Sequence, residues 1–126
     1  MIKIIAGLRR KRGMSREEFA AYYRDHHMAL ARRTMPREVA ERIVHYAQNH
    51  ARIVGSGTFE PPYDCVTEIG FEDEAGMRAY TDWYRGSGGA AVRDDEKTFL
   101  DSSEIGLLLI TDEERIPFGA DPLRDD

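Results

Sequence analysis

The chain has very little cysteine and no long apolar run. Cys65 is the sole cysteine among 126 residues, so an internal disulfide is impossible and the fold does not require an oxidising compartment. No stretch approaches the roughly 20 apolar residues that a helix needs to cross a bilayer. The apolar residues 2–5 precede the basic residues 9–12, which is the reverse of the order in a secretory signal. These features predict a soluble, cytoplasmic protein with no membrane partner.

Basic residues are scarce in the second half of the chain. Residues 1–60 hold 12 Lys and Arg against 6 Asp and Glu, whereas residues 61–126 hold 6 against 17. The net charge is -5, and the basic run at residues 9–12 lacks the interleaved aromatic side chains on which bases stack. We therefore predict no nucleic-acid partner. Attraction between the unlike halves would favour association of two copies instead.

Motifs for metals and nucleotides are also missing. His45 and His50 fall on opposite faces of a predicted strand, while His26 and His27 are adjacent on a predicted helix, so no pair is spaced to chelate a metal. The glycine-rich residues 86–89 follow a helix and lack the Lys and Ser/Thr of a phosphate-binding loop. We predict no metal site and no cofactor.

The periodicity of apolar residues predicts a strand at residues 2–8 and then a helix. Ser15 and Glu18 form a capping box that starts this helix, and Met35 should end it because it precedes Pro36. The other predicted elements are a helical piece at 36–42, strands at 43–50 and 63–71, a helix capped by Asp73, a helix at 90–99 and a strand at 105–110. We predict one domain over residues 1–111, followed by an acidic tail at 112–126 in which Ile116 and Phe118 could contact a partner copy.

This order of elements is the split βαβ pattern of an α+β ferredoxin-like fold, with a four-stranded antiparallel sheet and helices on one face. The last strand is the most apolar, so we expect it in the centre of the sheet. The uncovered face would be too apolar for water, so we expect a second copy to cover it in a homodimer. The residues assigned to that face are Ile5, Val66, Gly70, Leu108 and Ile110.

The histidine-bearing first helix is the most informative stretch for function. Tyr23 and His27 lie one helical turn apart, so a phenol and an imidazole can project toward the same place. Histidine titrates near neutral pH and is the commonest general acid or base, and a tyrosine hydroxyl can donate to a developing oxyanion. The alternative is that the histidines are hydrogen-bonded core or surface residues.

Polar residues also alternate along the predicted second strand, where Tyr46, Gln48 and His50 share one face. Polar groups on a buried face are costly unless they are paired, so this clustering indicates a wet cavity; an edge strand facing solvent is the alternative. Glu68, on the neighbouring strand, could orient a histidine, act as a base or form a surface salt bridge. Trp83 fits the core stripe of the second long helix, and we retain it as a candidate ligand contact.

Five segments together resemble the EthD-like family of the dimeric α+β barrel superfamily. They are GMSREEF at 13–19, YYRDHH at 22–27, YAQNH at 46–50, YDCVTEIGF at 63–71 and DEKTFLD at 95–101. The resemblance implies a ferredoxin-like fold, a homodimer, and a cleft between sheet and helices. His27 matches the family's helix-end histidine, but Met28 and Ala29 replace a common Gly-Pro or Ala-Pro, so the helix should extend further.

The resemblance also implies an activity class. Relatives in the superfamily include cofactor-free oxygenases and cyclases of aromatic polyketides, isomerases and decarboxylases. By this analogy the chain would be a cofactor-independent, monooxygenase-like oxidoreductase acting on a small aromatic or polyketide-like molecule. His27, His50 and Tyr46 would be catalytic, and Tyr23, Gln48, Glu68 and Trp83 would contact the substrate. The alternatives are a lyase, cyclase or isomerase, a non-catalytic small-molecule-binding dimer, or a haem binder.

Overall fold

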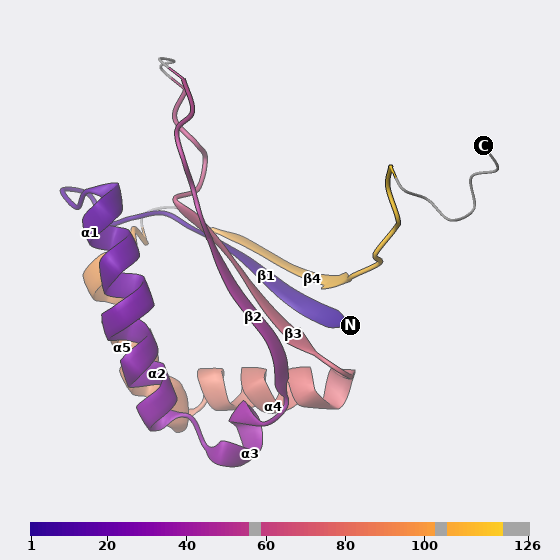
Figure 1. Cartoon of the computed structure of the whole chain (residues 1–126). Coiled ribbons are helices and arrows are strands. Elements are labelled where there is room, and N and C mark those ends of the chain that lie inside the picture. The colour runs from indigo at the N-terminus through magenta and orange to yellow at the C-terminus, as the bar shows by residue number, and fades with distance from the viewer. Residues whose placement is uncertain (56–58, 103–105, 120–126) are drawn as a thin grey trace.

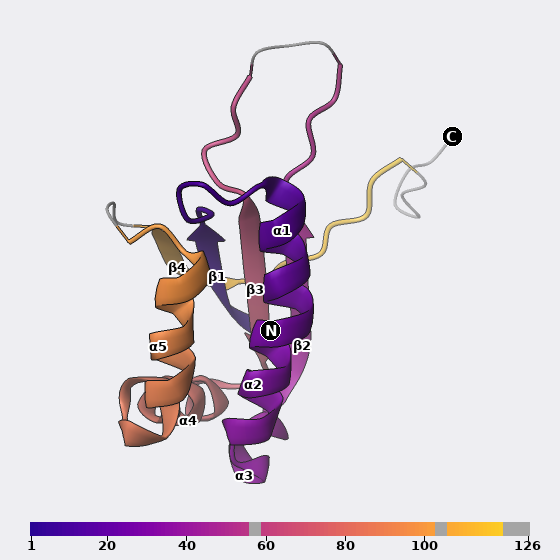
Figure 2. The same cartoon turned by 90° about the vertical axis from the view of Figure 1, so that its left-hand side faces the viewer.

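The structure, a computed structural model, describes residues 1–55, 59–102 and 106–119. Its centre is a four-stranded antiparallel sheet in the order β2-β3-β1-β4 (Figure 1). The helices gather on one face of this sheet (Figure 2). The strands are β1 (Ile2–Leu8), β2 (Ile43–His50), β3 (Cys65–Phe71) and β4 (Leu107–Asp112). The predicted ferredoxin-like α+β architecture is therefore confirmed.

The helical layer has three parts. One long helix runs without a break through α1 (Arg16–Ala21), η1 (Tyr22–His27) and α2 (Met28–Thr34), and the short α3 (Arg37–Ala40) follows it. α4 (Glu74–Arg85), the 3₁₀ turn η2 (Ser87–Gly89) and α5 (Ala90–Phe99) make up the rest. α5 stands beside the long helix, and α4 crosses below them (Figure 2). Within the described ranges, none of these helices has the length and apolarity needed to span a membrane.

The ends of the long helix follow local sequence signals. The Ser15 hydroxyl accepts a hydrogen bond from the amide of Glu18, and the Glu18 carboxylate accepts one from the amide of Ser15, both at 3.0 Å. The helix continues past Met28 to Thr34, and Met35 then adopts an extended conformation before Pro36. The sequence did not predict that its middle segment, η1, is π-helical.

The core lies between the sheet and the helices. Ile4, Ile69 and Phe71 pack against Met77 of α4 at one end of the sheet. Two further clusters continue the core: Phe19, Tyr23, Cys65 and Phe99, and between the helices Val39, Trp83 and Val92. The helix-facing side of β3 is thus its apolar side, as the alternation predicted.

β2 contains an irregularity that changes which residues face the core. Its register shifts between Ile43 and His45, so that Ile43 pairs with Phe71 whereas His45 pairs with Gly70. The sequence alternation placed Ile43 on the same face as His45, and this was wrong because the bulge inserts one residue. Ile43 packs on the core instead.

β4 is an edge strand that pairs with β1 alone, so its predicted central position was wrong. Leu108 and Ile110 pair with Ala6 and Ile4, which puts them on the helix-facing side rather than on the uncovered face. They are nevertheless 65% and 62% exposed. Apolarity predicted burial, but no element of this chain covers the edge. Ile105, the predicted first residue of the strand, lies outside the described residues.

The sheet extends beyond the predicted domain boundary at residue 111. β4 includes Asp112, and the amide of Glu113 donates to the carbonyl of Met1 at 3.0 Å. Beyond this point Ile116 and Phe118 are 74% and 98% exposed. The described part of the tail therefore presents two apolar side chains to solvent.

The uncovered face of the sheet holds a buried lysine. Lys3 is only 6% exposed, and its ammonium donates to Glu68 Oε1 at 2.6 Å and to the carboxylate of Glu113. Glu68 also accepts a hydrogen bond from Asn49 at 2.9 Å and lies 3.3 Å from His45 Nε2. This polar cluster occupies the middle of the face that the helices leave open.

We expect Glu113 to make stability depend on pH at the acid end. Hydrogen bonds from Lys3 and then Arg115 lower the pKa of Glu113 from 4.5 to about 2. Because the pKa is depressed in the folded state, this stabilisation is complete above about pH 4.5 and is lost as the pH falls toward 2. Thermal unfolding of Glu113→Gln should show a lower Tm than the parent at about pH 7, with a gap that narrows toward about pH 3. A gap of constant size, or the same behaviour in the exposed neighbour variant Glu114→Gln, would contradict the assignment.

Candidate functional site

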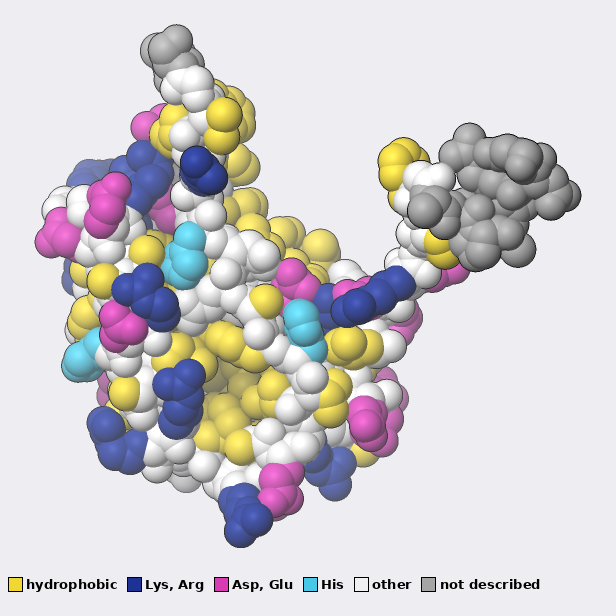
Figure 3. Space-filling model, viewed as in Figure 1, with side chains coloured by type: hydrophobic (Ala, Val, Ile, Leu, Met, Phe, Trp, Pro, Cys, Tyr) yellow, Lys and Arg dark blue, Asp and Glu magenta, His cyan; other side chains and the backbone are white. Residues whose placement is uncertain are grey.

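The molecule is hollowed between α2 and β2. Hydrophobic side chains line this hollow, and Lys and Arg side chains stand along its helical rim (Figure 3). We call this space the cleft. Its walls are the long helix on one side and the helix-facing side of β2 on the other, where Tyr46 Oη lies 3.1 Å from Met28 Sδ.

A chain of hydrogen bonds runs along the β2 wall. Gln48 donates through Nε2 to Tyr46 Oη at 2.9 Å, and Tyr46 Oη donates to Tyr23 Oη at 3.3 Å. Tyr23 Oη in turn lies 2.7 Å from Thr67 Oγ1. The amide of Gln48 is oriented by its bond to Tyr46, so its oxygen accepts from His50 Nε2 at 2.9 Å. Four of the predicted site residues, Tyr23, Tyr46, Gln48 and His50, are thus brought together.

The environment fixes the protonation of this chain. Burial raises the pKa of Tyr23 and of Tyr46, although hydrogen bonds offset part of the rise at Tyr46, so both phenols remain donors at neutral pH. Burial, and then the charge of Arg24, lower the pKa of His50. A neutral His50 that donates through Nε2 leaves Nδ1 as a bare acceptor, and this atom is buried without a partner.

His27 is held by a carboxylate from another helix. Its Nδ1 lies 2.9 Å from Asp95 Oδ2 on α5, and Tyr22 Oη donates to Asp95 Oδ1 at 2.6 Å. The imidazole packs against Phe99 and Tyr23, with ring centroids 4.8 Å and 5.7 Å away. Its Nε2 has no hydrogen bond in the described part of the chain, yet it is not among the atoms sealed from solvent.

Asp95 keeps the charge that this arrangement requires. Partial burial would raise the pKa of Asp95, but the hydrogen bonds from Tyr22 and His27 outweigh it, and the net pKa is lowered. An ionised Asp95 accepts from Nδ1–H, which leaves the lone pair on His27 Nε2. The same orientation of an imidazole by a carboxylate operates in catalytic triads.

The sequence interpretation gave no role to Asp95. Its one signal was the segment at residues 95–101 within the family resemblance, because Asp95 and His27 lie 68 positions apart. The π-helical segment that carries Tyr23 and His27 was also missed. Such segments occur often at functional sites, and here η1 buries both side chains.

Tyr80 on α4 is a further polar group that sequence reasoning did not single out. Burial raises the pKa of Tyr80, with smaller effects of the nearby Glu96 and Tyr46. None of the described residues hydrogen-bonds its hydroxyl, and this oxygen is not sealed from solvent. Glu96 itself pairs with Tyr84, at 2.9 Å from Oε2, and lines a separate cavity of about 290 Å³.

Two predicted contact residues lie elsewhere. Glu68 is on the opposite face of the sheet, where it binds Lys3 and approaches His45 rather than His27 or His50. Trp83 belongs to the cluster between the helices, 6.0 Å from the ring of Tyr80, and its Nε1 is buried without a partner. The structure therefore separates Glu68 from the cleft and places Trp83 behind Tyr80.

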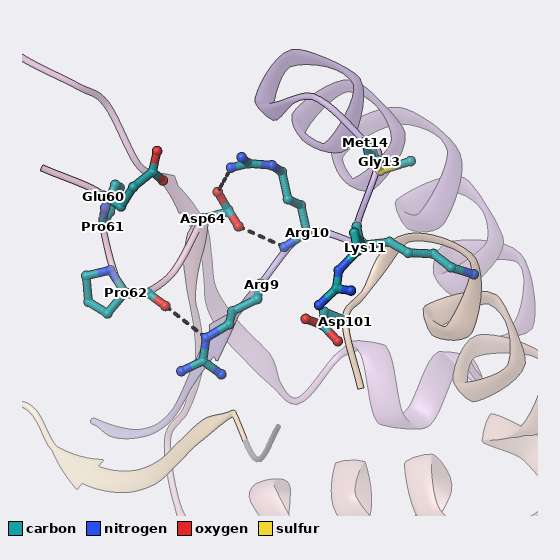
Figure 4. A pocket seen from close by; sticks show the side chains of 11 residues that line it. Arg9, Arg10, Lys11, Gly13, Met14, Glu60, Pro61, Pro62, Asp64 and Asp101 are labelled. Carbon is teal, nitrogen blue, oxygen red and sulfur yellow. Dashed lines mark hydrogen bonds and ion pairs between the residues drawn. The ribbon is translucent and has the colours of Figure 1, made fainter. Parts of the chain in front are cut away.

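Another cavity of about 360 Å³ lies where β1 leads toward α1 (Figure 4). Its basic residues are largely engaged. Arg10 binds Asp64 through its side chain at 2.5 Å and through its amide at 2.8 Å, and Arg9 Nε donates to the carbonyl of Pro62 at 3.1 Å. Within residues 1–55, 59–102 and 106–119, no group of three or more His, Cys, Asp or Glu is placed to hold a metal ion.

The architecture and the cleft define a ferredoxin-like α+β protein, and comparison with known proteins specifies the family. The EthD domain model matches residues 11–103, so the chain belongs to the EthD domain family. No curated protein matches the chain.

Solved structures share the fold at low sequence identity. An EthD-like protein from Ralstonia eutropha JMP134 is 15% identical, with a TM-score of 0.61 over 87% of this chain and 88% of that one. An ethyl tert-butyl ether d (EthD) family protein from Bacillus halodurans C-125 is 22% identical, with a TM-score of 0.58 over 90% and 99%. A dimeric ferredoxin-like protein of unknown function from Thermobifida fusca YX is 15% identical, with a TM-score of 0.51 over 87% and 90%.

Proposed function

We propose that the cleft binds a small aromatic or polyketide-like molecule and transforms it by acid–base chemistry without a metal or a cofactor. The observation that carries this proposal is His27, whose Nε2 is open and unpaired while Asp95 holds Nδ1 at 2.9 Å. A hydrophobic hollow with a few convergent polar groups is typical of small-molecule sites.

The proposed chemistry begins with removal of a proton. His27 Nε2 takes the proton from an acidic carbon next to a conjugated carbonyl, and the negative charge moves onto the carbonyl oxygen. A hydroxyl of Tyr46 or Tyr80 donates to that oxygen, because burial keeps both phenols protonated. A positioned base contributes about 10² to 10⁴ in rate, and an oxyanion donor about 10² to 10³.

Oxidation by dioxygen is the favoured outcome, by analogy with relatives in the superfamily. The carbanion transfers electrons to dioxygen and forms a carbon–oxygen bond. One oxygen atom remains as a new carbonyl and the other leaves as water, so a CH₂ group and O₂ become a C=O group and H₂O. The protein would then be a cofactor-independent oxidoreductase.

A lyase, cyclase or isomerase in the same cleft is the second candidate. The chain from His50 through Gln48 to Tyr46 is a second proton-bearing group on the wall opposite His27. It could return a proton to a different atom of the same anion, which would consume no dioxygen. A non-catalytic binding dimer is the third candidate, and the exposure of His27, only 7%, favours it.

Dioxygen uptake with 9-anthrone, an aromatic ketone with an acidic CH₂ group, separates these candidates. We expect uptake above the uncatalysed rate, one anthraquinone formed per dioxygen consumed, and no effect of a metal chelator. A changed product without uptake would support the lyase or isomerase. Unchanged anthrone that stays bound would support the binder, and absence of both binding and turnover across a panel of such molecules would refute the proposal.

We also propose that the protein is a homodimer in which the uncovered sheet face is buried. Ile5 and Leu109 pair on that face, and the edge strand β4 leaves Leu108 and Ile110 exposed. Apolar patches of this kind mark association surfaces, and the Thermobifida fusca neighbour is described as dimeric. We further propose a cytoplasmic location, since the one cysteine is free and buried.

A further inference from the structure

Two rows of side chains face each other across the cleft. Arg24, Met28 and Arg32 recur at every fourth residue of the long helix, so they lie along one side of it. The contact between Met28 Sδ and Tyr46 Oη, at 3.1 Å, sets the alignment of the two rows. The row on β2 consists of Tyr46, Gln48 and His50.

The electrostatic neighbours agree with this alignment. After burial, the charge of Arg24 is the next cause that lowers the pKa of His50, at one end of the strand row. Arg32 opposes the rise in the pKa of Tyr46 at the other end. An arginine therefore stands at each end of the helical row, and Figure 3 shows the basic rim beside the hollow.

The two arginines differ in what binds them. Arg24 is paired with Asp25, with Nη2 at 3.1 Å from Oδ2 and Nε at 3.2 Å from Oδ1. Arg32 is exposed and has neither a hydrogen bond nor an ion pair to any residue that the structure describes. An unneutralised guanidinium thus lies next to a hydrophobic hollow.

We infer that the ligand of the cleft is an aromatic carboxylate, with its ring in the hollow and its carboxylate bound by Arg32. This inference rests on the proposed function, because it specifies the ligand of the same cleft. A guanidinium binds a carboxylate through two parallel N–H···O bonds, which fixes the orientation of the ligand as well as its charge. The carboxylate is at the outer end, because Arg32 is on the rim and the phenols are inside.

A matched pair of probes tests the inference on the full chain. Naphthalene-2-carboxylate and naphthalene-2-carboxamide share a ring and differ in charge, and calorimetry gives the Kd of each. The parent should prefer the carboxylate by about tenfold, and added salt should reduce this preference. Arg32→Gln should bind both probes within about twofold of each other, with the affinity for the carboxamide unchanged.

Arg33→Gln is the control variant. Arg33 is also exposed, but it lies about 100° around the helix from Arg32, so this variant should keep the preference of the parent. Equal binding of the two probes by the parent, or a preference that survives in Arg32→Gln, would overturn the inference and leave the proposed function standing. Failure of both probes to bind would refute the proposed function together with the inference.

Discussion

His27→Gln is expected to abolish turnover by about 10² to 10⁴ while the protein stays folded. Glutamine has a volume close to that of histidine and a polar group that Asp95 can still bind, so the contacts with Phe99 and Tyr23 are largely preserved. It has no basic nitrogen, however, and the base of the proposed reaction is lost. Initial rates of product formation measure the effect, and circular dichroism and thermal unfolding check the fold.

His26→Gln is the matched control for this experiment. His26 is the neighbouring histidine, but it is exposed and stacks on Tyr22 with ring centroids 4.5 Å apart. Its replacement should leave turnover within about twofold of the parent. A folded His27→Gln variant that converts every substrate as fast as the parent would show that His27 is not the base.

Leu109→Glu is expected to split the homodimer, with a rise in the dimer Kd of at least about 100-fold. Leu109 is opposite Ile5 on the uncovered face and is 49% exposed in one protomer. A carboxylate buried there without a partner costs several kcal/mol. Sedimentation velocity at micromolar concentration measures the change.

Val54→Glu provides the comparison, since Val54 is 83% exposed in the loop that leads away from the sheet (Figure 1). This variant should sediment like the parent. A parent protein that is monomeric at micromolar concentration would refute the homodimer. A Leu109→Glu variant that stays dimeric would move the interface to another surface.

Local signals explain why many element boundaries could be predicted from the sequence. β2 and α5 have the predicted bounds, residues 43–50 and 90–99. The Ser15 capping box, the Asp73 cap and Pro36 act on the backbone within a few residues of themselves, so a single sequence displays them. The alternation along β2 likewise brought Tyr46, Gln48 and His50 onto one face.

Features that depend on distant partners could not be predicted. The position of β4 follows from its pairing with β1, about 100 residues away, and its apolar composition indicated a burial that one protomer does not supply. The Asp95 partner of His27 comes from a different helix and has no signature in the spacing of residues. Glu68 had the right chemistry for a site residue, but the polar cluster around Lys3 holds it on the opposite face.

The π-helical segment η1 divides one continuous helix into two halves with different neighbours. A π turn contains one residue more than an α turn between its hydrogen-bonded groups. Deleting one residue from Tyr22–His27 would restore a regular helix, but it would rotate everything after it by about 100° relative to Phe19. Met28 and Arg32 would then turn away from β2. The extra residue thus sets the phase of the second half, so that the first half can anchor in the core while the second half addresses the ligand.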